Sequence, residues 1–328
     1  MGLGVRYTTR LALDKTRAVP EYYLVPKRAA RAWPWLGRAV QWFEARAFGF
    51  AFWLIDRLSP ERASAWGAAM FGWLGPLGDK ARKADRNLAI AFPDKSDAWR
   101  RETTRGIFRS LGKSAAELIK LHQIWEEREQ RLEFDIAPAA REHLESGGAA
   151  VFVSAHVGPW QVTNLISLHM GLDISVIYAT ESNAALRERM LELREAFGVN
   201  LVPVEAGVRP LLRELNNGRC IGMAMDTRLD TGQLIPFFGK EALTNTTAAR
   251  LALRSGAALL PIRAERLGKA RYRVTVYDPI VVPAGELDSD AKASAMTLEV
   301  HHHFEQWISA QPDQWICLKR RWPKAHKL

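Results

Sequence analysis

A histidine at position 156 is the residue of this chain whose surroundings best suit acid–base chemistry. The apolar run Ala149–Ser154 precedes it, and Gly158 and Pro159 follow it, ahead of a helical pattern. This order predicts a strand that ends near His156 and a helix that begins soon afterwards. A neutral imidazole in that position can take a proton from a hydroxyl group that attacks a thioester carbonyl. The N–H groups at the start of the helix can help to hold an oxyanion or a phosphate.

Other residues that often carry chemistry give weaker signals. A lone histidine at a strand end is more often structural than catalytic, so His156 needs support from elsewhere in the chain. The run His301–His303 lies in a predicted helix, where adjacent side chains point in different directions and cannot share a metal ion. Cys220 opens an apolar strand, where a thiol is usually inert. No glycine-rich nucleotide motif follows a strand, so we expect neither a metal nor a nucleotide cofactor.

The elements that must position His156 follow from the rhythm of the sequence beyond Arg128. Short runs rich in Val, Ile and Leu alternate there with longer amphipathic stretches. The expected strands lie near residues 149–154, 174–178, 200–204, 220–225, 258–263 and 272–277, and the expected helices near residues 160–169, 184–197, 208–216, 246–255 and 291–310. This alternation predicts an α/β fold with a mainly parallel central sheet flanked by helices. In such sheets ligands bind where strands end and helices begin, which is where His156 lies.

The segment before this domain is aromatic and apolar. Its two apolar runs, Ala47–Ile55 and Ala63–Gly78, are shorter than the roughly twenty residues that a membrane-spanning helix needs. We therefore predict three parts: a basic N-terminal extension at residues 1–32, a membrane-associated helical segment at 33–78, and the main domain at 79–328. Helices that lie in one leaflet fit the flanking arginines, but a pair of ordinary core helices remains the alternative.

Composition narrows the class of partner. The chain of 328 residues carries 46 Lys and Arg against 36 Asp and Glu, a net charge of +10, which implies an anionic partner. Its 12 Trp and 13 Phe favour a membrane surface over nucleic acid, because indole rings prefer the boundary of a bilayer. A basic nucleic-acid-binding module is the weaker alternative, since no nucleic-acid-binding signature is present. With two cysteines and no metal-ligand spacing, a reducing, cytosolic setting fits.

Several short segments, in order over more than two hundred residues, carry a further signal. They are Arg86–Pro93, the His156 box, Asn217–Asp226, Pro236–Lys240, Thr246–Ala252, Gly256–Pro261 and Pro312–Trp322. On these segments the chain, from about Asn87 to its end, resembles the late lipid A acyltransferases of Gram-negative bacteria. These enzymes are the lauroyl and myristoyl transferase group within the lysophospholipid and glycerolphosphate acyltransferase superfamily. The resemblance implies that family's fold for the main domain.

The resemblance also implies an activity. It is the transfer of a fatty acyl chain from acyl carrier protein to a hydroxyl of a lipid A precursor or related glycolipid, without a covalent acyl-enzyme and without a cofactor. The expected location is the cytoplasmic face of the cell inner membrane, with peripheral or monotopic attachment to the membrane surface. Two alternatives stay open: the same chemistry on another anionic lipid acceptor, such as a phospholipid or an aminolipid, and a catalytically silent lipid-binding relative.

The second alternative comes from a departure at Gln161. The family's box is His, four residues, then Asp or Glu, and the carboxylate is here replaced by an amide. Gln161 can accept a hydrogen bond from the imidazole but cannot offset the charge of an imidazolium. Three explanations compete: a nearby acid takes over, the enzyme runs slowly on a good thioester, or catalysis is lost. Asp226, which matches an acid that the family keeps after the Cys220 strand, is the candidate acid.

Five further residues are predicted to bind substrate. Arg194 matches an arginine of the family and can hold an acceptor phosphate bidentately, although an ion pair on a helix surface is nearly as good an explanation. Phe237 and Phe238 can line an acyl slot whose depth selects chain length, with plain core packing as the alternative. Thr246 and Thr247 belong to a loop that enters a helix, in a region that borders the acyl and acceptor sites in the family.

Overall fold

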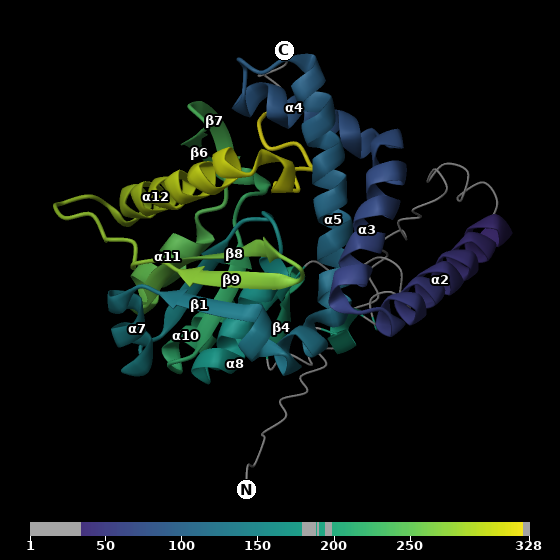
Figure 1. The fold of residues 1–328 in the computed structure, drawn as a ribbon. Helices are drawn as coiled ribbons and strands as arrows, with labels where there is room; N and C mark the ends of the chain where they lie inside the picture. The colour runs from purple at the N-terminus through teal and green to yellow at the C-terminus, as the bar shows by residue number, and fades with distance from the viewer. Residues whose placement is uncertain (1–33, 179–187, 189, 194–198, 324–328) are drawn as a thin grey trace, which may run out of the picture.

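A seven-stranded sheet forms the centre of the computed structural model, which describes residues 34–178, 188, 190–193 and 199–323 (Figure 1). The strands are β1 (Leu132–Ile136), β2 (Ala150–Ser154), β3 (Ile174–Tyr178), β4 (Val199–Pro203), β5 (Cys220–Ala224), β8 (Ala258–Gly268) and β9 (Arg271–Val276). Their order in the sheet is β1-β9-β8-β2-β5-β3-β4. Every pair is parallel except β8 with β9, so the predicted mainly parallel sheet is confirmed. All five residues of the central strand β2 are buried, as expected for a parallel strand covered on both faces.

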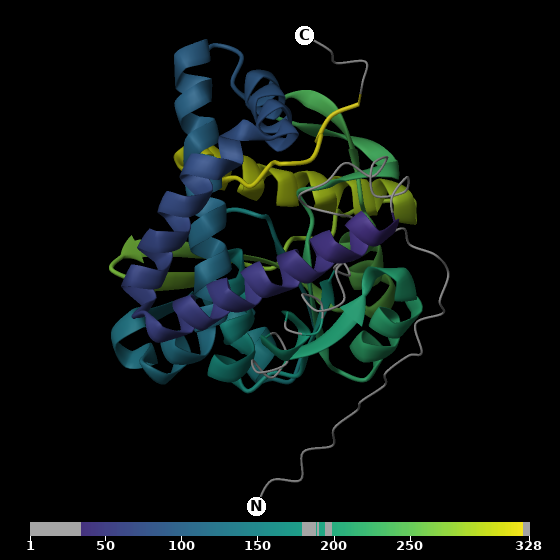
Figure 2. The ribbon, with the colours of Figure 1, turned by 90° about the vertical axis from the view of Figure 1, so that its right-hand side faces the viewer.

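Helices cover both faces of this sheet (Figures 1 and 2). On one side lie α10 (Arg209–Asn216), α11 (Thr247–Ser255) and α12 (Ser289–Ala310), and on the other lie α5 (Asp97–Glu126), α7 (Pro138–Glu145), the 3₁₀ helix η2 (Trp160–Leu165) and α8 (Ile166–Met170). Val151 and Val153 of β2 pack in one core with Phe304 of α12. Phe152, between them in the strand, packs in a second core with Leu118 of α5. Successive residues of β2 thus serve opposite cores.

The six predicted strands are confirmed within a few residues, and so are the helices expected near 208–216, 246–255 and 291–310. The helix expected near 184–197 falls largely outside the described residues. Three strands were not predicted: β1 and the hairpin of β6 (Arg228–Phe237) and β7 (Lys240–Thr244). Polar and charged residues interrupt the apolar runs of these strands, and the prediction relied on such runs. The hairpin also turns at Phe238 and Gly239, both with positive φ, which Phe seldom adopts.

Among the described residues, two α-helices precede α4 (Asp79–Ala91), and they pack differently. In α3 (Pro60–Leu74), Gly67 lies so close to Gly112 of α5 that a Cβ on Gly67 would come within 2.3 Å of the Gly112 carbonyl oxygen. The two backbones therefore touch, and α3 packs closely against α5. By contrast, α2 (Pro34–Arg57) lies on the outer side of α3 and α5 (Figures 1 and 2). It exposes Trp35, Trp42, Phe43, Phe50 and Trp53.

The remaining short elements are η1 (Gly75–Leu77), α6 (Arg128–Arg131), η3 (Val204–Ala206) and η4 (Pro312–Gln314). In the part of the chain that the structure describes, no helix is both long and apolar enough to cross a bilayer. The predicted basic extension at 1–32 lies outside the described residues. The predicted division of the chain near residue 78 stays a prediction.

Candidate active site

His156 lies in a loop that follows β2, and the C-terminal segment holds this loop in place. The backbone oxygen of His156 accepts a hydrogen bond from the Ile316 N–H (2.8 Å), and the Gly158 N–H donates to the Gln314 oxygen (3.0 Å). Between these two bonds, Val157 forms an antiparallel bridge with Trp315. The loop is thus paired from His156 to Gly158 with a chain segment that comes from the far end of the sequence.

Asp226 supplies the hydrogen-bond partner of the imidazole. It follows β5, the sheet neighbour of β2, so the carboxyl ends of two adjacent parallel strands bring the two side chains together. His156 Nδ1 lies 2.7 Å from Asp226 Oδ1, and the Trp315 indole N–H donates to Asp226 Oδ2 (3.1 Å). The Asp226 side chain is 3% exposed and that of His156 is 31% exposed. The carboxylate is therefore buried and fully engaged, while the imidazole reaches the surface.

Each member of this pair shifts the pKa of the other. Burial alone would raise the pKa of Asp226, but the His156 charge and hydrogen bond, aided by Trp315, hold it below its usual value. Burial alone would lower the pKa of His156, and the Asp226 carboxylate outweighs this and raises it. With Nδ1–H donated to a carboxylate, the neutral ring keeps its lone pair on Nε2. That nitrogen is the one that can accept a proton.

Gln161 does not take the position of the missing acid beside Nδ1, because Asp226 occupies it. Gln161 lies in η2, and its Oε1 atom is buried without a hydrogen-bond partner among the described residues. The structure thus supplies the contact required by the explanation in which a nearby acid takes over. The catalytic roles of His156, Gln161 and Asp226 stay predictions.

The two phenylalanines predicted to line an acyl slot belong to an aromatic cluster beside the pair. Phe237 is fully buried, with ring contacts to His301, Trp315 and Trp322. Phe238 stacks on Trp315 at a centroid distance of 6.2 Å, and its N–H donates to Glu305 Oε1 (2.6 Å). Phe238 is therefore linked to Asp226 through the Trp315 ring, and Phe237 has the surroundings of a core residue.

The other predicted binding residues are not brought to His156 by any contact in the described chain. Thr246 Oγ1 accepts a hydrogen bond from Arg250 Nε (2.9 Å), and the Thr247 N–H donates to Asn245 Oδ1 (2.9 Å). Both threonines thus lie where the predicted loop enters α11, and the Asn245 side chain supplies the bond to the start of this helix. Arg194 lies outside the described residues, so its role as an acceptor clamp stays a prediction.

Trp315 is the site residue that sequence reasoning did not single out. It stands within the Pro312–Trp322 segment that carries the family likeness, but no spacing rule connects it to Asp226, which lies 89 positions earlier. Within the described ranges, no three His, Cys, Asp or Glu side chains converge to hold a metal ion.

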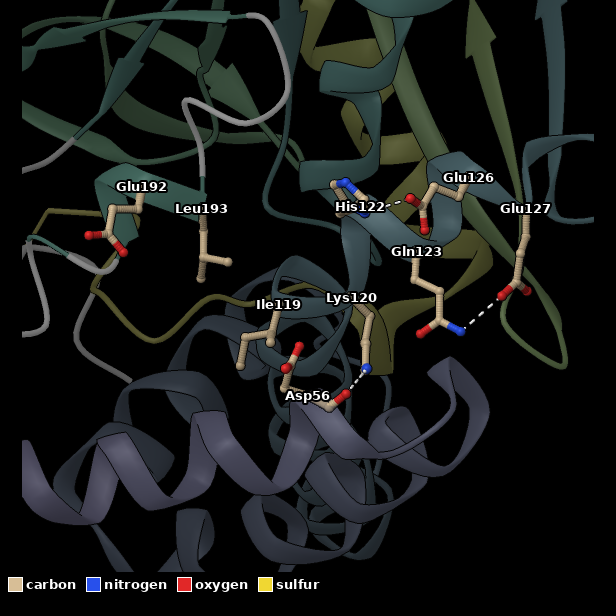
Figure 3. Close-up of a pocket in the computed structure, with 9 residues that line it drawn as sticks. All are labelled: Asp56, Ile119, Lys120, His122, Gln123, Glu126, Glu127, Glu192 and Leu193. Atoms are coloured by element: carbon tan, nitrogen blue, oxygen red, sulfur yellow. Dashed lines mark hydrogen bonds and ion pairs between the residues drawn. The ribbon is translucent and has the colours of Figure 1, made fainter.

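A cavity of about 500 Å³ lies apart from this pair, between α2, the end of α5 and residues 192–193 (Figure 3). It is lined by Asp56, Ile119, Lys120, His122, Gln123, Glu126, Glu127, Glu192 and Leu193. Several of its polar groups are paired: Lys120 Nζ donates to the Asp56 backbone oxygen (2.6 Å), and Gln123 Nε2 donates to Glu127 Oε1 (2.8 Å). Neither His156 nor Asp226 reaches it, so we assign it no part in the chemistry.

Comparison with known proteins places the site in context. The model of the family described as bacterial lipid A biosynthesis acyltransferase matches residues 36–324. Similar curated proteins are phosphatidylinositol mannoside acyltransferases. Two from strains of Mycobacterium tuberculosis are 27% identical over 184 residues (55% of this chain, 56% of the relative) and 26% identical over 222 residues (65% and 68%). One from Mycolicibacterium smegmatis is 25% identical over 184 residues (55% and 58%). The first of these alignments thus spans little more than half of its relative's length.

Proposed function

This chain belongs to the bacterial lipid A biosynthesis acyltransferase family, and from that membership we propose that it transfers a fatty acyl chain to a hydroxyl group of a glycolipid. The observation that carries the proposal is the hydrogen bond between His156 Nδ1 and the buried Asp226 carboxylate. A histidine with an ionised acid on one ring nitrogen and a free lone pair on the other is the arrangement that general-base catalysis uses.

In the proposed reaction, His156 Nε2 accepts the proton of the acceptor hydroxyl as its oxygen attacks the thioester carbonyl of the donor. A tetrahedral intermediate forms, and the imidazolium that results is stabilised by Asp226. The carbon–sulfur bond then breaks, and the thiolate takes the proton from the imidazolium. The products are an ester and a free thiol, and no acyl group becomes attached to the protein.

We propose acyl carrier protein as the donor and a lipid A precursor or related glycolipid as the acceptor. The family's description supports lipid A, and the relatives' names point to a phosphatidylinositol mannoside. Both lipids are glycolipids that carry phosphate, and the basic chain, with its net charge of +10, can attract that phosphate.

Association with the membrane surface at the cytoplasmic face of the inner membrane completes the proposal, and α2 supports it. The Arg46 guanidinium lies 5.2 Å from the ring centre of Trp42, and that of Arg57 lies 4.1 Å from the ring centre of Trp53. Exposed indoles flanked by arginines suit the headgroup region of a bilayer, where the ring sits at the apolar boundary and the cation meets phosphate.

The first test is transfer of a labelled acyl chain from acyl carrier protein, and from the coenzyme A thioester in parallel, to a panel of acceptors. The panel holds lipid A precursors, phosphatidylinositol mannosides, phospholipids and aminolipids. We expect transfer by the wild type to a glycolipid and its loss in His156→Ala. The exposed His122, with 68% of its side chain accessible, supplies the control variant His122→Ala. Retained transfer in His156→Ala would remove His156 from the mechanism.

A catalytically silent lipid-binding role is the second candidate, because the buried amide oxygen of Gln161 stands where the family has an acid and has no partner among the described residues. In that case the wild type binds the acceptor lipid in vesicles and forms no product, while Gln161→Glu restores transfer. Absence of product in both proteins, with every donor and acceptor of the panel, would oppose both candidates.

A further inference from the structure

Arg266, a largely buried arginine of β8, is the centre of a polar network beside the His156 loop. Its Nε and Nη2 atoms donate to the two carboxylate oxygens of Glu117 in α5, at 2.7 and 2.8 Å. The same guanidinium donates to Ser110, Ser114 and Gln314. The Arg266 side chain is 11% exposed and that of Glu117 is 3% exposed. This fork therefore ties together three separate elements: the sheet, α5 and the C-terminal segment.

The network ends on the backbone of Gly158, two residues after His156. Ser114 Oγ, which accepts from Arg266 Nη2 (2.7 Å), lies 2.9 Å from the Gly158 carbonyl oxygen and 3.0 Å from that of Ser110. The Gln314 side chain accepts from Arg266 Nη1 (3.0 Å), and the Gln314 backbone accepts from the Gly158 N–H (3.0 Å). Both polar groups of Gly158 are thus held by residues that Arg266 orients.

The conformation of Gly158 shows how closely the network fits the loop. Its φ of +60° lies in the left-handed region. A Cβ at this position would lie 2.9 Å from Gln314 Oε1 and 3.3 Å from the Ala264 oxygen, so a side chain there would be strained and would have to displace the Gln314 amide. The turn that follows His156 is therefore built against the network, two residues from the imidazole.

A gain in folding stability does not explain why this ion pair is present. Two charges taken out of water contribute little net stability, and replacing a buried ion pair by apolar residues of similar volume is often neutral or favourable. A guanidinium that donates hydrogen bonds to several elements does, however, fix the relative positions of those elements. Residues that support a catalytic group from behind act in the same way.

We propose that the Arg266–Glu117 pair fixes the backbone of Gly158, through Ser114 and Gln314, and so sets the orientation of His156. The inference rests on the proposed acyl transfer. Arg266 and Glu117 act as positioning residues, one hydrogen-bonded step away from the loop, and touch neither substrate.

The test replaces both charges together, because removing one alone leaves the other buried and unpaired. The variant Glu117→Leu/Arg266→Met is compared with Glu265→Leu/Arg263→Met. The control pair lies on the same strand, with Arg263 Nη2 at 3.1 Å from Glu265 Oε1, and has no contact with Gly158. We expect the first variant to lose about 10²-fold in kcat, with little change in KM or in melting temperature, and the control to retain kcat. Equal kcat in the two variants would overturn the proposal.

Two further measurements distinguish a positioning role of Arg266 from an effect of its charge. Arg266→Lys keeps a cation beside Glu117 but cannot reach Ser114 and Gln314 together, so we expect the same kcat loss. The acid limb of the pH profile should stay in place, because Asp226 is untouched. Full activity in Arg266→Lys, or a displaced acid limb in the double variant, would mean that Arg266 acts through its charge and would refute a positioning role.

Hydrogen exchange tests the inference without any activity. The Gly158 and Ile316 N–H groups, which pair the loop with the C-terminal segment, should exchange faster in Glu117→Leu/Arg266→Met than in the wild type, and at the wild-type rate in the control. If the wild type transfers no acyl group, the proposed function fails and this measurement alone decides whether the pair fixes the loop. Unchanged exchange would show that it does not.

Discussion

Two histidine sites of this protein, a half-buried one at His156 and a buried one at His301, share a ring tautomer and differ in their other contacts. His156 Nδ1 meets the Asp226 carboxylate at 2.7 Å, and His301 Nδ1 meets the Pro236 carbonyl oxygen, also at 2.7 Å. In both, a neutral ring donates Nδ1–H and keeps its lone pair on Nε2. The Nε2 atom of His301, however, already accepts a hydrogen bond from Arg321 Nη2 (3.1 Å). Of these two imidazoles, only that of His156 has an Nε2 atom without a hydrogen-bond partner among the described residues.

The charges beside the two rings also have opposite signs. Asp226 raises the pKa of His156 despite burial. Burial, with the Arg321 cation, lowers the pKa of His301 to about 3. His301 therefore serves as a neutral link that joins β6 to the C-terminal segment, where Arg321 also donates to the Leu243 oxygen and Thr244 Oγ1. Burial lowers the pKa of both histidines. The difference between the two sites therefore comes from the group that lies beside each ring nitrogen.

The largest expected effect comes from removing the charge that distinguishes the two sites. Asp226→Asn keeps the size of the side chain but can donate to Nδ1 and so reverse the tautomer. The same change in a serine protease triad costs about 10⁴ in kcat, and we expect a loss of that order. The acid limb of the activity profile should also move to lower pH, because the pKa of His156 falls without the carboxylate. Steady-state kinetics from pH 5 to 9 measure both effects.

The control for this variant is Asp230→Asn, since Asp230 is 76% exposed and pairs only with Arg228 among the described residues. This control variant should keep the wild-type kcat and the wild-type pH profile of activity. An Asp226→Asn protein with an undisplaced acid limb would mean that Asp226 does not set the basicity of His156.

A smaller effect is expected from the indole that holds the second carboxylate oxygen. Trp315→Phe removes one hydrogen bond to a charged group, a contact with a net contribution of about 1.5–3 kcal/mol, so kcat should fall about 10- to 100-fold. Trp307→Phe is the matched control. The two tryptophans are 1% and 2% exposed, but the Trp307 indole nitrogen has no hydrogen-bond partner among the described residues. Equal kcat in the two variants would show that the bond to Asp226 carries no catalytic weight.

At His301 the comparison predicts an effect on stability. In the folded chain the pKa of His301 is about 3, below the ordinary value of 6.5. From pH 6.5 downward, the unfolded chain therefore binds a proton that the folded chain does not bind. The free energy of unfolding should therefore fall by about 2 kcal/mol between pH 7 and pH 5 through this residue alone. Urea unfolding of wild type and His301→Gln measures it: the variant should lose that much less between the two pH values. Equal losses would contradict the low pKa.

The sequence predicts these two sites unevenly, and the reasons are physical. Strand β2 and the place of His156 follow from an uninterrupted apolar run, because a buried parallel strand must be apolar on both faces. Asp226 follows from the family likeness together with adjacent parallel strands. Trp315 does not follow from either, since its bond to Asp226 depends on how the C-terminal segment returns across the loop. The run His301–His303 lies in the helix that the sequence predicts near residues 291–310, but its pattern cannot reveal the Arg321 contact.

The smallest expected effect concerns the departure from the family's box. Asp226 already occupies Nδ1 of His156, so a carboxylate at position 161 has no free ring N–H to accept. Gln161 Oε1 is also buried, so the carboxylate of a glutamate there would lose hydration, which favours its neutral form. We therefore expect Gln161→Glu to transfer acyl groups no faster than the wild type, in the assay that detects the loss in Asp226→Asn. A clear gain in kcat would show instead that Asp226 only partly replaces the missing acid, and that the free Nε2 of His156 does not by itself give this site its full rate.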